Sequence, residues 1–389
     1  MDAKVESGSE AFSLNADQRA IQEMSQAFAA DRVAPHALEW DEKRHFPADV
    51  IRETGPLGFG GIYVRDDVGG SALGRLDAVL IFEALAAACP GFSSFISIHN
   101  MAAWMIDVFG NEEQRKRFLP KLTSMEWLAS YCLTEPGAGS DAAALKTRAV
   151  KSGDHYVING SKQFISGAGV SDIYVTMVRT GEDGPNGVST LVIPKDAPGL
   201  SFGPAEKKMG WHMQPTRQVV FEDCRVPVEN LLSDEGQGFR IAMAGLDGGR
   251  LNIAACSLGG AQSAVDKAVA YTGEREAFGQ KINRFQGLQF KLADMETNLN
   301  ASRMLLYTAA ARLDAKAPDA SKWSAMAKRF VTDTCFDIAN DALQLHGGYG
   351  YLHEYGLEKL VRDLRVHQIL EGTNEIMRVI VARHMVGRS

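Results

Sequence analysis

The chain has 389 residues, of which 45% are hydrophobic and 23% charged, and its formal net charge is −7 at pH 7. This composition is ordinary for a globular protein, and the length predicts two or three domains. The negative charge balance and the lack of a long basic run disfavour nucleic acid as a main partner.

Three features of the sequence indicate the compartment and whether a metal binds: the amino terminus, the cysteines and the histidines. The first residues, MDAKVESGSEAF, contain early acids and no apolar stretch, so we expect neither a secretory signal nor a transit peptide. No stretch approaches the roughly 20 apolar residues of a membrane helix, so no membrane contact is expected. The five cysteines contain no C-x-x-C pair and the nine histidines show no metal-binding spacing, which indicates reduced thiols and no metal site. We therefore expect a bacterial cytoplasmic protein, or a mitochondrial matrix protein if the source is eukaryotic.

The first third is predicted to be helical. Asn15 starts a capping pattern followed by apolar residues at helical spacing, and we expect Pro35 to help end this helix. Further helices are predicted over 76–88 and 111–119, the second stopped by Pro120.

The middle of the chain carries strand signals. Hairpin turns are predicted at Ser152-Gly153-Asp154 and at Asn159-Gly160. The predicted strands cover 146–150, 155–158, 173–179, 188–193 and 217–221. Together they predict an antiparallel β domain of about a hundred residues.

Helical patterns return after this region and persist to the end. The predicted helices cover 239–255, 257–274, 287–315, 321–346 and 374–385. Helices and strands do not alternate along the chain, so a doubly wound parallel sheet is disfavoured. The fold class expected is a multidomain α+β protein, with a helical domain over 1–128, a β domain over 129–238 and a helical bundle over 239–389.

A glycine-rich stretch lies near the start of the β region. Gly137-Ala-Gly139-Ser140-Asp141-Ala142 matches the dinucleotide-binding pattern, but a hairpin follows it where that pattern needs a helix and a second parallel strand. A flexible turn is the plainest interpretation. A third interpretation is a loop that meets a ligand through backbone N–H groups and the Ser140 hydroxyl, because glycines permit close approach.

Glu371 lies between Ile369-Leu370 and Gly372. Apolar neighbours would raise the pKa of this carboxyl towards the range of a general base. The alternative is an acid favoured by the dipole at a helix start, and residue type alone favours that alternative.

Further candidates could surround a cofactor. Phe164 and Ser166 share one face of a strand, where they could stack on and hydrogen-bond to a flat heteroaromatic ring. Arg275 could pair with a phosphate, and Gly347-Gly348 could let the backbone approach a ligand. Ordinary packing, a solvated arginine and a helix stop are the alternatives, each of them favoured when a motif is taken singly.

Four strings in chain order resemble the acyl-CoA dehydrogenase family, and the resemblance covers nearly the whole chain. They are Tyr131-Cys-Leu-Thr-Glu-Pro-Gly-Ala-Gly-Ser140-Asp141, Arg275-x-x-Phe278-Gly279, Gln344-x-x-Gly347-Gly348-x-Gly350 and Glu371-Gly-Thr. Each is moderately specific, and four around a central β domain are highly specific. The resemblance implies an N-terminal helical domain, a middle antiparallel β-barrel-like domain and a C-terminal four-helix bundle, usually assembled as a homotetramer (a dimer of dimers).

The resemblance also implies FAD as the cofactor. Residues expected along the flavin are Tyr131, Cys132, Leu133, Thr134, Gly139, Ser140, Phe164, Ile165, Ser166, Thr373, Asn374 and Glu375. Residues expected to bind the adenosine pyrophosphate of a neighbouring subunit's FAD are Arg275, Phe278, Phe285, Gln286, Gln344, Leu345, His346, Gly347 and Gly348. Substrate-side positions are Ser140, Asp247, Gly248, Gly249, Arg250, Gly372 and Arg383.

This chain departs from the family pattern at two positions. Many relatives have Trp where this chain has Phe164, which keeps a π face but loses the indole donor. Some relatives carry their base just before the arginine of the Asp247–Arg250 segment. That position is Gly249 here, which concentrates the assignment of the base on Glu371.

The reaction implied is α,β-dehydrogenation of an acyl-CoA thioester. Glu371 would take the α-proton, a hydride would pass from the β-carbon to flavin N5, and a ribityl hydroxyl and the Glu371 N–H would bind the thioester carbonyl. The strings ISIHNMAAWMID, DHYVINGSKQFISGAG and VHQILEGTNEIMR make isobutyryl-CoA the first choice of substrate. Butyryl-CoA, 2-methylbutyryl-CoA and isovaleryl-CoA stay open.

The electron acceptor expected from the resemblance is an electron-transfer flavoprotein. The rival functions are an acyl-CoA oxidase, a flavin monooxygenase and a non-catalytic scaffold that binds FAD or CoA.

Overall fold

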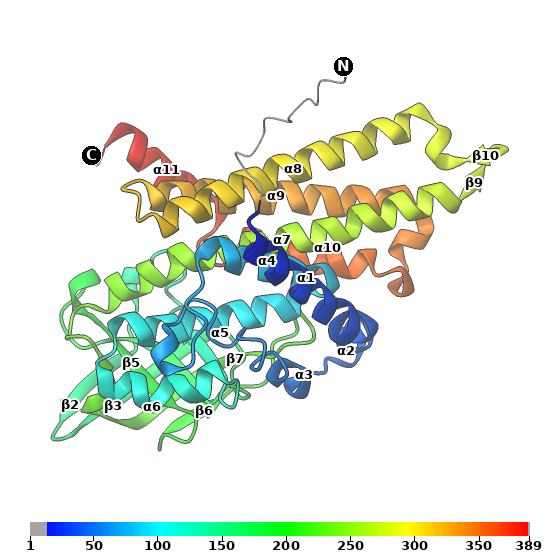
Figure 1. Ribbon diagram of the computed structural model, residues 1–389. Helices are drawn as coiled ribbons and strands as arrows, with labels where there is room; N and C mark the ends of the chain where they lie inside the picture. The colour runs from blue at the N-terminus through cyan, green and yellow to red at the C-terminus, as the bar shows by residue number, and fades with distance from the viewer. Residues whose placement is uncertain (1–13, 388–389) are drawn as a thin grey trace.

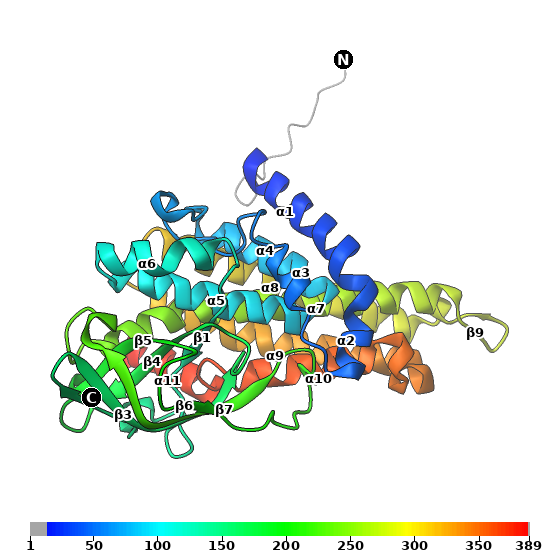
Figure 2. The ribbon, with the colours of Figure 1, turned by 90° about the horizontal axis from the view of Figure 1, so that it is seen from below.

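The computed structural model describes residues 14–387. Long helices lie over one side of a β region, and the N-terminal helices pack against both (Figure 1). The N-terminal helices are α1 Ala16–Phe28, α2 Ala37–Lys43, α3 Ala48–Arg52, α4 Arg75–Ala88, α5 Pro90–Phe109 and α6 Glu112–Thr123. The sequence patterns did not predict α5, which is apolar on all sides because it packs against α7 on one side and the first strand on another (Figure 2).

Two prolines behave differently from the prediction. Asn15 caps α1 as expected, but a π turn over Ala29–Val33 and a 3₁₀ turn over Ala34–His36 carry the chain past Pro35 into α2. Pro35 lies at the start of that short turn, where a missing N–H costs little. Pro120 lies inside α6, which continues to Thr123. The burial of Phe118 and Leu122 on the core side outweighs the one hydrogen bond that the proline removes.

The β region is one mixed sheet. Its strands are β1 Ala129–Cys132, β2 Arg148–Ser152, β3 His155–Ser166, β4 Ile173–Arg179, β5 Val188–Pro194, β6 Leu200–Phe202, β7 Thr216–Pro227 and β8 Leu231–Leu232. Their order is β6-β7-β3-β2-β4-β5-β8, with β1 beside β4. Most pairs are antiparallel as predicted, but β4 pairs in parallel with β1 and with β2.

The second predicted hairpin turn is wrong. The Ser152-Gly153-Asp154 turn does join β2 to β3, but β3 runs straight through Asn159-Gly160, where its register with β7 shifts. Gly160 has φ +139°, and an added Cβ would lie 2.7 Å from the Thr147 Cα. The glycine therefore serves a bulge with a close backbone approach.

The C-terminal part is built on α7 Gly238–Glu274, α8 Gln286–Asp314 and α9 Ala320–His346, with α10 Leu357–Arg365 and α11 Asn374–Val386 packed on α9. A small hairpin, β9 Glu276–Ala277 and β10 Gln280–Lys281, protrudes at the far end (Figure 1). The predicted break near residue 256 is wrong, since α7 is one helix. An added Cβ at Gly259 would touch the backbone of α4, so this glycine permits close packing of the two helices.

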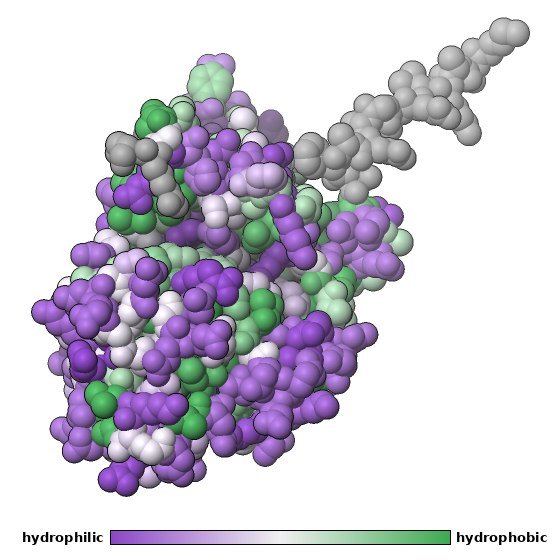
Figure 3. Space-filling model, turned by 90° about the vertical axis from the view of Figure 1, so that its left-hand side faces the viewer, coloured by the Kyte–Doolittle hydropathy of each residue, from purple (hydrophilic) through white to green (hydrophobic). Residues whose placement is uncertain are grey.

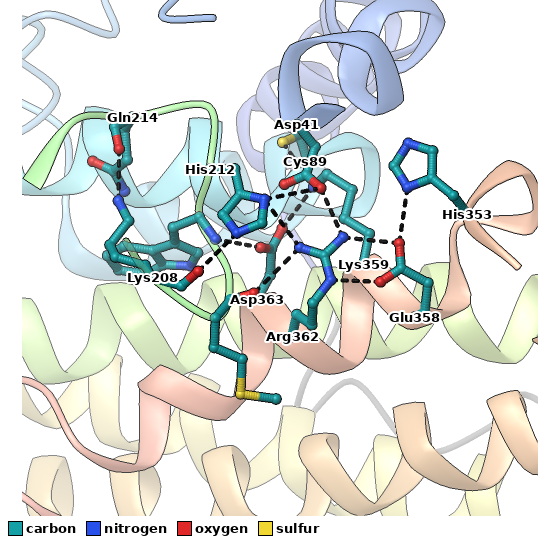
Figure 4. Close-up of polar contacts among 12 residues, drawn as sticks. Asp41, Cys89, Lys208, His212, Gln214, His353, Glu358, Lys359, Arg362 and Asp363 are labelled. Carbon is teal, nitrogen blue, oxygen red and sulfur yellow. Dashed lines mark hydrogen bonds and ion pairs between the residues drawn. The ribbon is translucent and has the colours of Figure 1, made fainter. Parts of the chain in front are cut away.

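An ion-pair network joins α2, the β6–β7 connection and α10 (Figure 4). Arg362 donates to Asp41 at 2.7 Å and to Glu358 at 2.5 and 2.8 Å, and Lys359 pairs with Asp363 at 2.6 Å. Asp41, Glu358 and His353 have ligand atoms within 4.8 Å of one another, as a metal site would. The Arg362 guanidinium already supplies the positive charge there, so we interpret the group as an ion-pair network. None of the helices within residues 14–387 combines the length and the apolar character needed to span a bilayer.

Candidate active site

Glu371 lies in the loop between α10 and α11, in a backbone conformation that other residues stabilise. Its φ is +56° and that of Gly372 is +86°. The left-handed region costs an ordinary residue roughly 1–2 kcal/mol, so neighbouring groups must stabilise it. The N–H groups of Ile369 and Leu370 donate to the Val366 carbonyl at 2.9 and 3.0 Å, and Lys328 Nζ donates to the Gly372 carbonyl at 2.8 Å.

The Glu371 side chain points towards the middle of α7. Its Oε2 atom is buried and has no hydrogen-bond partner among residues 14–387, and a Cβ added to Gly249 would collide with it. Beside it, Arg250 Nη1 donates to Asp247 Oδ1 at 2.6 Å, and Ser321 Oγ on α9 donates to Asp247 Oδ2. The structure therefore brings the predicted substrate-side segment Asp247–Arg250 and the predicted base together.

The environment of Glu371 changes its acidity. Burial raises the pKa of this carboxyl to about 7, while the positive charges of Lys328 and Arg250 act in the opposite direction. A carboxyl with a pKa near neutrality exchanges a proton readily at physiological pH, which is what a general base requires.

Strand β1 connects Glu371 with the predicted flavin face. The Tyr131 hydroxyl is buried without a partner, and its pKa is raised by burial and then by the nearby charge of Glu371. The preceding residue, Ser130, donates from Oγ to the Ser166 carbonyl at 2.7 Å. Cys132 and Leu133 are buried in two separate core clusters, so only their backbone is free to face a ligand.

The loop after β1 is anchored by a buried ion pair and left open at its tip. Lys162 Nζ lies 2.7 Å from Glu135 Oε1, and Glu135 also accepts from the N–H groups of Lys146 and Thr147. At the tip, a Cβ added to Gly137 or Gly139 would meet nothing within 4 Å. Ser140 and Gly139 are both exposed.

Ile165 on β3 is buried, whereas Phe164 is exposed and Ser166 is partly exposed. A register shift between Lys162 and Ile165 makes a bulge there, and Phe164 has φ +59°. The phenyl ring is 65% exposed. An exposed aromatic ring in a strained conformation offers a face to a ligand.

A second group of predicted residues surrounds a cavity of about 400 Å³ at the far end of the bundle. Its lining includes Arg275 and the backbone turn at Gly347, whose φ is +58°. The lining residues are Tyr271, Arg275, Ile282, Gln344, Leu345, His346, Gly347, Gly348, Tyr349 and Leu352. The His346 ring is buried and stacks on Tyr271 at 4.2 Å between centroids, so it serves packing.

The protruding hairpin lies next to this cavity. Phe278 is 95% exposed, and its ring packs edge to face against Phe285 at 6.0 Å between centroids. Gln286, the first residue of α8, is exposed beside them.

The two groups of predicted residues lie far apart in one chain. Arg250 lies on α7 and Arg275 directly follows its last residue, Glu274, so about 37 Å of helix rise separates them at 1.5 Å per residue. Glu371 lies just before α11 in the chain, and Figure 3 shows a hollow between the helical bundle above and the β region below on the side that it draws. A single chain does not bring the two groups together.

The remaining predicted positions follow Glu371. Thr373 caps α11 by accepting from the Ile376 N–H at 3.4 Å. Asn374 is buried, and its amide donates to Asp333 and Thr332 on α9, so its side chain faces the bundle. Glu375 is exposed, and Arg383 is exposed on α11, about 18 Å of chain rise from Glu371 at 1.5 Å per residue.

Sequence reasoning missed several residues around the carboxylate. Met101 from α5 lies beside Gly249, and Arg75 lies beside Gly248 with its guanidinium 3.8 Å from the centre of the Tyr63 ring. Lys328 is fully buried on α9. Its helical spacing with Ala325, Thr332 and Cys335 places a lysine on an apolar face, and this was the available signal.

Comparison with known proteins agrees with this arrangement. Three family models match in order: the N-terminal domain of acyl-CoA dehydrogenase over residues 15–126, the middle domain over 130–224 and the C-terminal domain over 236–386. The mitochondrial isobutyryl-CoA dehydrogenase of Dictyostelium discoideum is 58% identical over 373 residues, which cover 96% of this chain and 90% of that protein.

Solved structures agree as well. The butyryl-CoA dehydrogenase of Megasphaera elsdenii is 37% identical with a TM-score of 0.94, covering 96% of this chain and 99% of that one. A chain in a structure described as "Electron transferring flavoprotein of Acidaminococcus fermentans: Towards a mechanism of flavin-based electron bifurcation" is 41% identical with a TM-score of 0.95, covering 97% and 100%. With all three domains matched in order, this chain belongs to the acyl-CoA dehydrogenase family of oxidoreductases.

Proposed function

We propose that this protein catalyses the FAD-dependent α,β-dehydrogenation of isobutyryl-CoA, with Glu371 as the base that removes the α-proton. The observation that supports the role of Glu371 best is its buried, unpartnered Oε2, which faces a glycine on α7 and has no protein proton donor to neutralise it. The residue type and the pKa near 7 suit proton abstraction from a bound thioester.

The choice of substrate rests on likeness. The Dictyostelium discoideum relative at 58% identity is an isobutyryl-CoA dehydrogenase, whereas the structure at 37% identity is a butyryl-CoA dehydrogenase. Greater identity over the whole chain favours the short branched substrate. Butyryl-CoA is the second candidate, and 2-methylbutyryl-CoA the third.

The residues present fit FAD, on which members of this family depend. The exposed Phe164 ring, the buried and unpartnered Tyr131 hydroxyl and the open glycines at the loop tip make a face with unsatisfied polar atoms and no side chains in the way. Bound there, FAD supplies the acceptor for the hydride that leaves the β-carbon. Phe164 and Ser166 would contact its ring, and Arg275 would pair with a phosphate.

The protein's own contribution is position and proton transfer. Glu371 takes the α-proton at its carboxylate, and its backbone N–H donates to the thioester carbonyl as negative charge develops there. Arg250, fixed by Asp247 at 2.6 Å, keeps a positive charge near the carboxylate. The reacting C–H bonds must be aligned at the same time, so the held loop conformation matters as much as the residue type.

Three further features belong to the proposal. The 37 Å or so between the two residue groups on α7 favours assembly in which a second subunit's cavity meets the first subunit's flavin face, within a homotetramer. An electron-transfer flavoprotein is the proposed acceptor of the electrons, in line with the source of the chain that is 41% identical. The compartment is proposed as the bacterial cytoplasm or the mitochondrial matrix, the latter because the Dictyostelium discoideum relative is mitochondrial.

The test of the proposed function is the variant Glu371→Gln, which keeps shape and removes the base. We expect retained FAD, retained binding of isobutyryl-CoA and turnover lowered by about 100-fold or more, the usual size of a general-base contribution. Glu296→Gln, the same change at an exposed carboxylate on α8, is the matched control and should turn over normally. Near-normal turnover of Glu371→Gln refutes the assignment, and a higher kcat/KM for butyryl-CoA than for isobutyryl-CoA refutes the choice of substrate.

A further inference from the structure

Lys328 is a buried lysine that contacts the loop carrying Glu371. It lies on α9 and is completely inaccessible to solvent. Its Nζ donates to the carbonyl of Gly372 at 2.8 Å and to Asn374 Oδ1 at 2.9 Å. The first of these acceptors belongs to the residue next to Glu371, so the lysine ties α9 directly to the strained part of the loop.

The second acceptor makes the attachment rigid. The Asn374 amide nitrogen donates to Asp333 Oδ1 at 2.6 Å and to Thr332 Oγ1 at 2.9 Å, both on α9. Asp333 also accepts from Gln368 at 2.9 Å, on the other side of Glu371. The loop is therefore fastened to one helix both before and after the carboxylate, and Lys328 supplies the contact nearest to it.

From this geometry we propose that Lys328 is a positioning residue for the reaction: it holds Glu371 in its left-handed backbone conformation and places an ammonium group against the loop that carries the carboxylate. The inference deepens the proposed function and rests on it. Burial alone would make Glu371 a weaker acid, and a fixed ammonium group close by favours its charged form. Lys328 is the largest of the effects that lower the Glu371 pKa, ahead of Arg250.

Other charged and titratable groups act on the same carboxylate. Arg250 on α7 favours the ionised form, and Asp247 neutralises part of that guanidinium. Tyr131 on β1 and Tyr63 feel the charge of Glu371, and both have raised pKa values, chiefly through burial, so they stay neutral. Burial lowers the pKa of Lys328 to about 8, and the charges of Glu371, Asp333 and Glu375 act in the opposite direction.

The experiment measures the titration of Glu371 in the FAD-loaded enzyme. The carboxyl infrared band is followed against pH and assigned by subtracting the spectrum of Glu371→Gln. We expect Lys328→Met to move the midpoint upward by at least about one pH unit, the usual effect of one nearby opposite charge. The acid limb of kcat/KM should move with it, and Lys328→Arg, which keeps the charge, should retain most of the wild-type midpoint.

The matched control is Lys208→Met. Lys208 is also a largely buried lysine with a pKa lowered by burial to about 8, and it donates two hydrogen bonds, to the Gln214 carbonyl and Thr216 Oγ1. Its loss removes a comparable buried charge but should leave the Glu371 midpoint unchanged. If Lys328→Met does not fold, Lys328→Gln keeps a donor without the charge and is titrated in its place.

Two results would overturn the inference. One is a midpoint in Lys328→Met or Lys328→Gln within 0.3 pH units of wild type, roughly the scatter of a pKa titration. The other is an equal shift in Lys328→Arg, which would mean that packing and not charge is what matters. Neither depends on whether Glu371 is the base, because normal turnover in Glu371→Gln would refute the proposed function alone.

Discussion

Gly249 offers the sharpest test of how closely the Glu371 carboxylate is positioned. A Cβ added at this glycine would lie 3.0 Å from Glu371 Cδ and 3.0 Å from Met101 Sδ, and nearer still to Glu371 Oε2, whereas ordinary contacts begin at 3.4 Å. The substitution Gly249→Ala therefore requires the carboxylate to retreat by about 1 Å. Displacements of about 1 Å at a reacting group can lower the rate by roughly 100-fold.

The same substitution should not unfold the protein. The atoms that must move belong to the flexible side chains of Glu371 and Met101, and alanine inside a helix is favoured over glycine by about 0.5–1 kcal/mol. We therefore expect Gly249→Ala to keep a wild-type melting temperature and to bind FAD, while kcat with isobutyryl-CoA falls by about 100-fold.

Gly273→Ala is the matched control on the same helix. Its added Cβ would meet only Asn283 Nδ2, at 3.6 Å, which is an ordinary contact. Thermal melting and steady-state turnover of both variants decide the matter. A Gly249→Ala enzyme within fivefold of wild-type kcat would show that the carboxylate does not need the position seen here.

Three further predictions concern stability and cofactor binding. Glu371 has its pKa raised by burial from 4.5 to about 7, so the folded state binds more protons than the unfolded state between these values, and stability falls as pH rises through this window. Glu371→Gln should thus be more stable than wild type at pH 8, by on the order of 3 kcal/mol at 1.36 kcal/mol per pH unit, but not at pH 4.5. Denaturant unfolding of the substrate-free enzyme measures this difference in stability. A difference that does not change with pH contradicts the prediction. Lys162→Met leaves the buried Glu135 carboxylate without its ion-pair partner and should lower the free energy of unfolding by about 3–5 kcal/mol, and Lys162→Met/Glu135→Gln should recover part of this loss. Equal unfolding midpoints of the single and double variants contradict this prediction. Arg275→Gln should weaken FAD binding by roughly tenfold, because one charged hydrogen bond of about 1.5 kcal/mol is lost. The melting temperature of the FAD-free protein should stay unchanged. Equilibrium dialysis measures the FAD affinity, and an unaltered affinity removes Arg275 from the cofactor site.

Much of the fold was accessible from periodicity, since the order of helices, β region and helices follows from where the apolar spacing changes. The errors occur where tertiary packing overrides a local signal. Pro120 stays inside α6 because the buried contacts around it outweigh a lost hydrogen bond, and α7 runs without a break past residue 256. Asn159-Gly160 has the sequence of a turn but serves a bulge, because only a glycine fits against Thr147.

Some residues of the candidate site could be predicted from the sequence, and others could not. Glu371 was a candidate from its apolar neighbours and the Glu371-Gly-Thr string, and Arg250 was a candidate from the family resemblance alone. Lys328, Met101 and Arg75 come from three different helices, and only the packing of these helices brings them to the carboxylate or to the glycines beside it. Residue type also gave no sign that the Asn374 side chain would donate a hydrogen bond to Asp333 on α9 and so fix the loop to that helix.

The most direct measurement is an anaerobic mixing experiment in which the FAD-loaded enzyme meets excess isobutyryl-CoA and the oxidised flavin absorbance is followed in time. The account predicts rapid bleaching in the wild type and bleaching slowed by about 100-fold or more in Glu371→Gln, which still binds the thioester. Persistent yellow colour in the wild type, or equal bleaching rates in the two proteins, would contradict it.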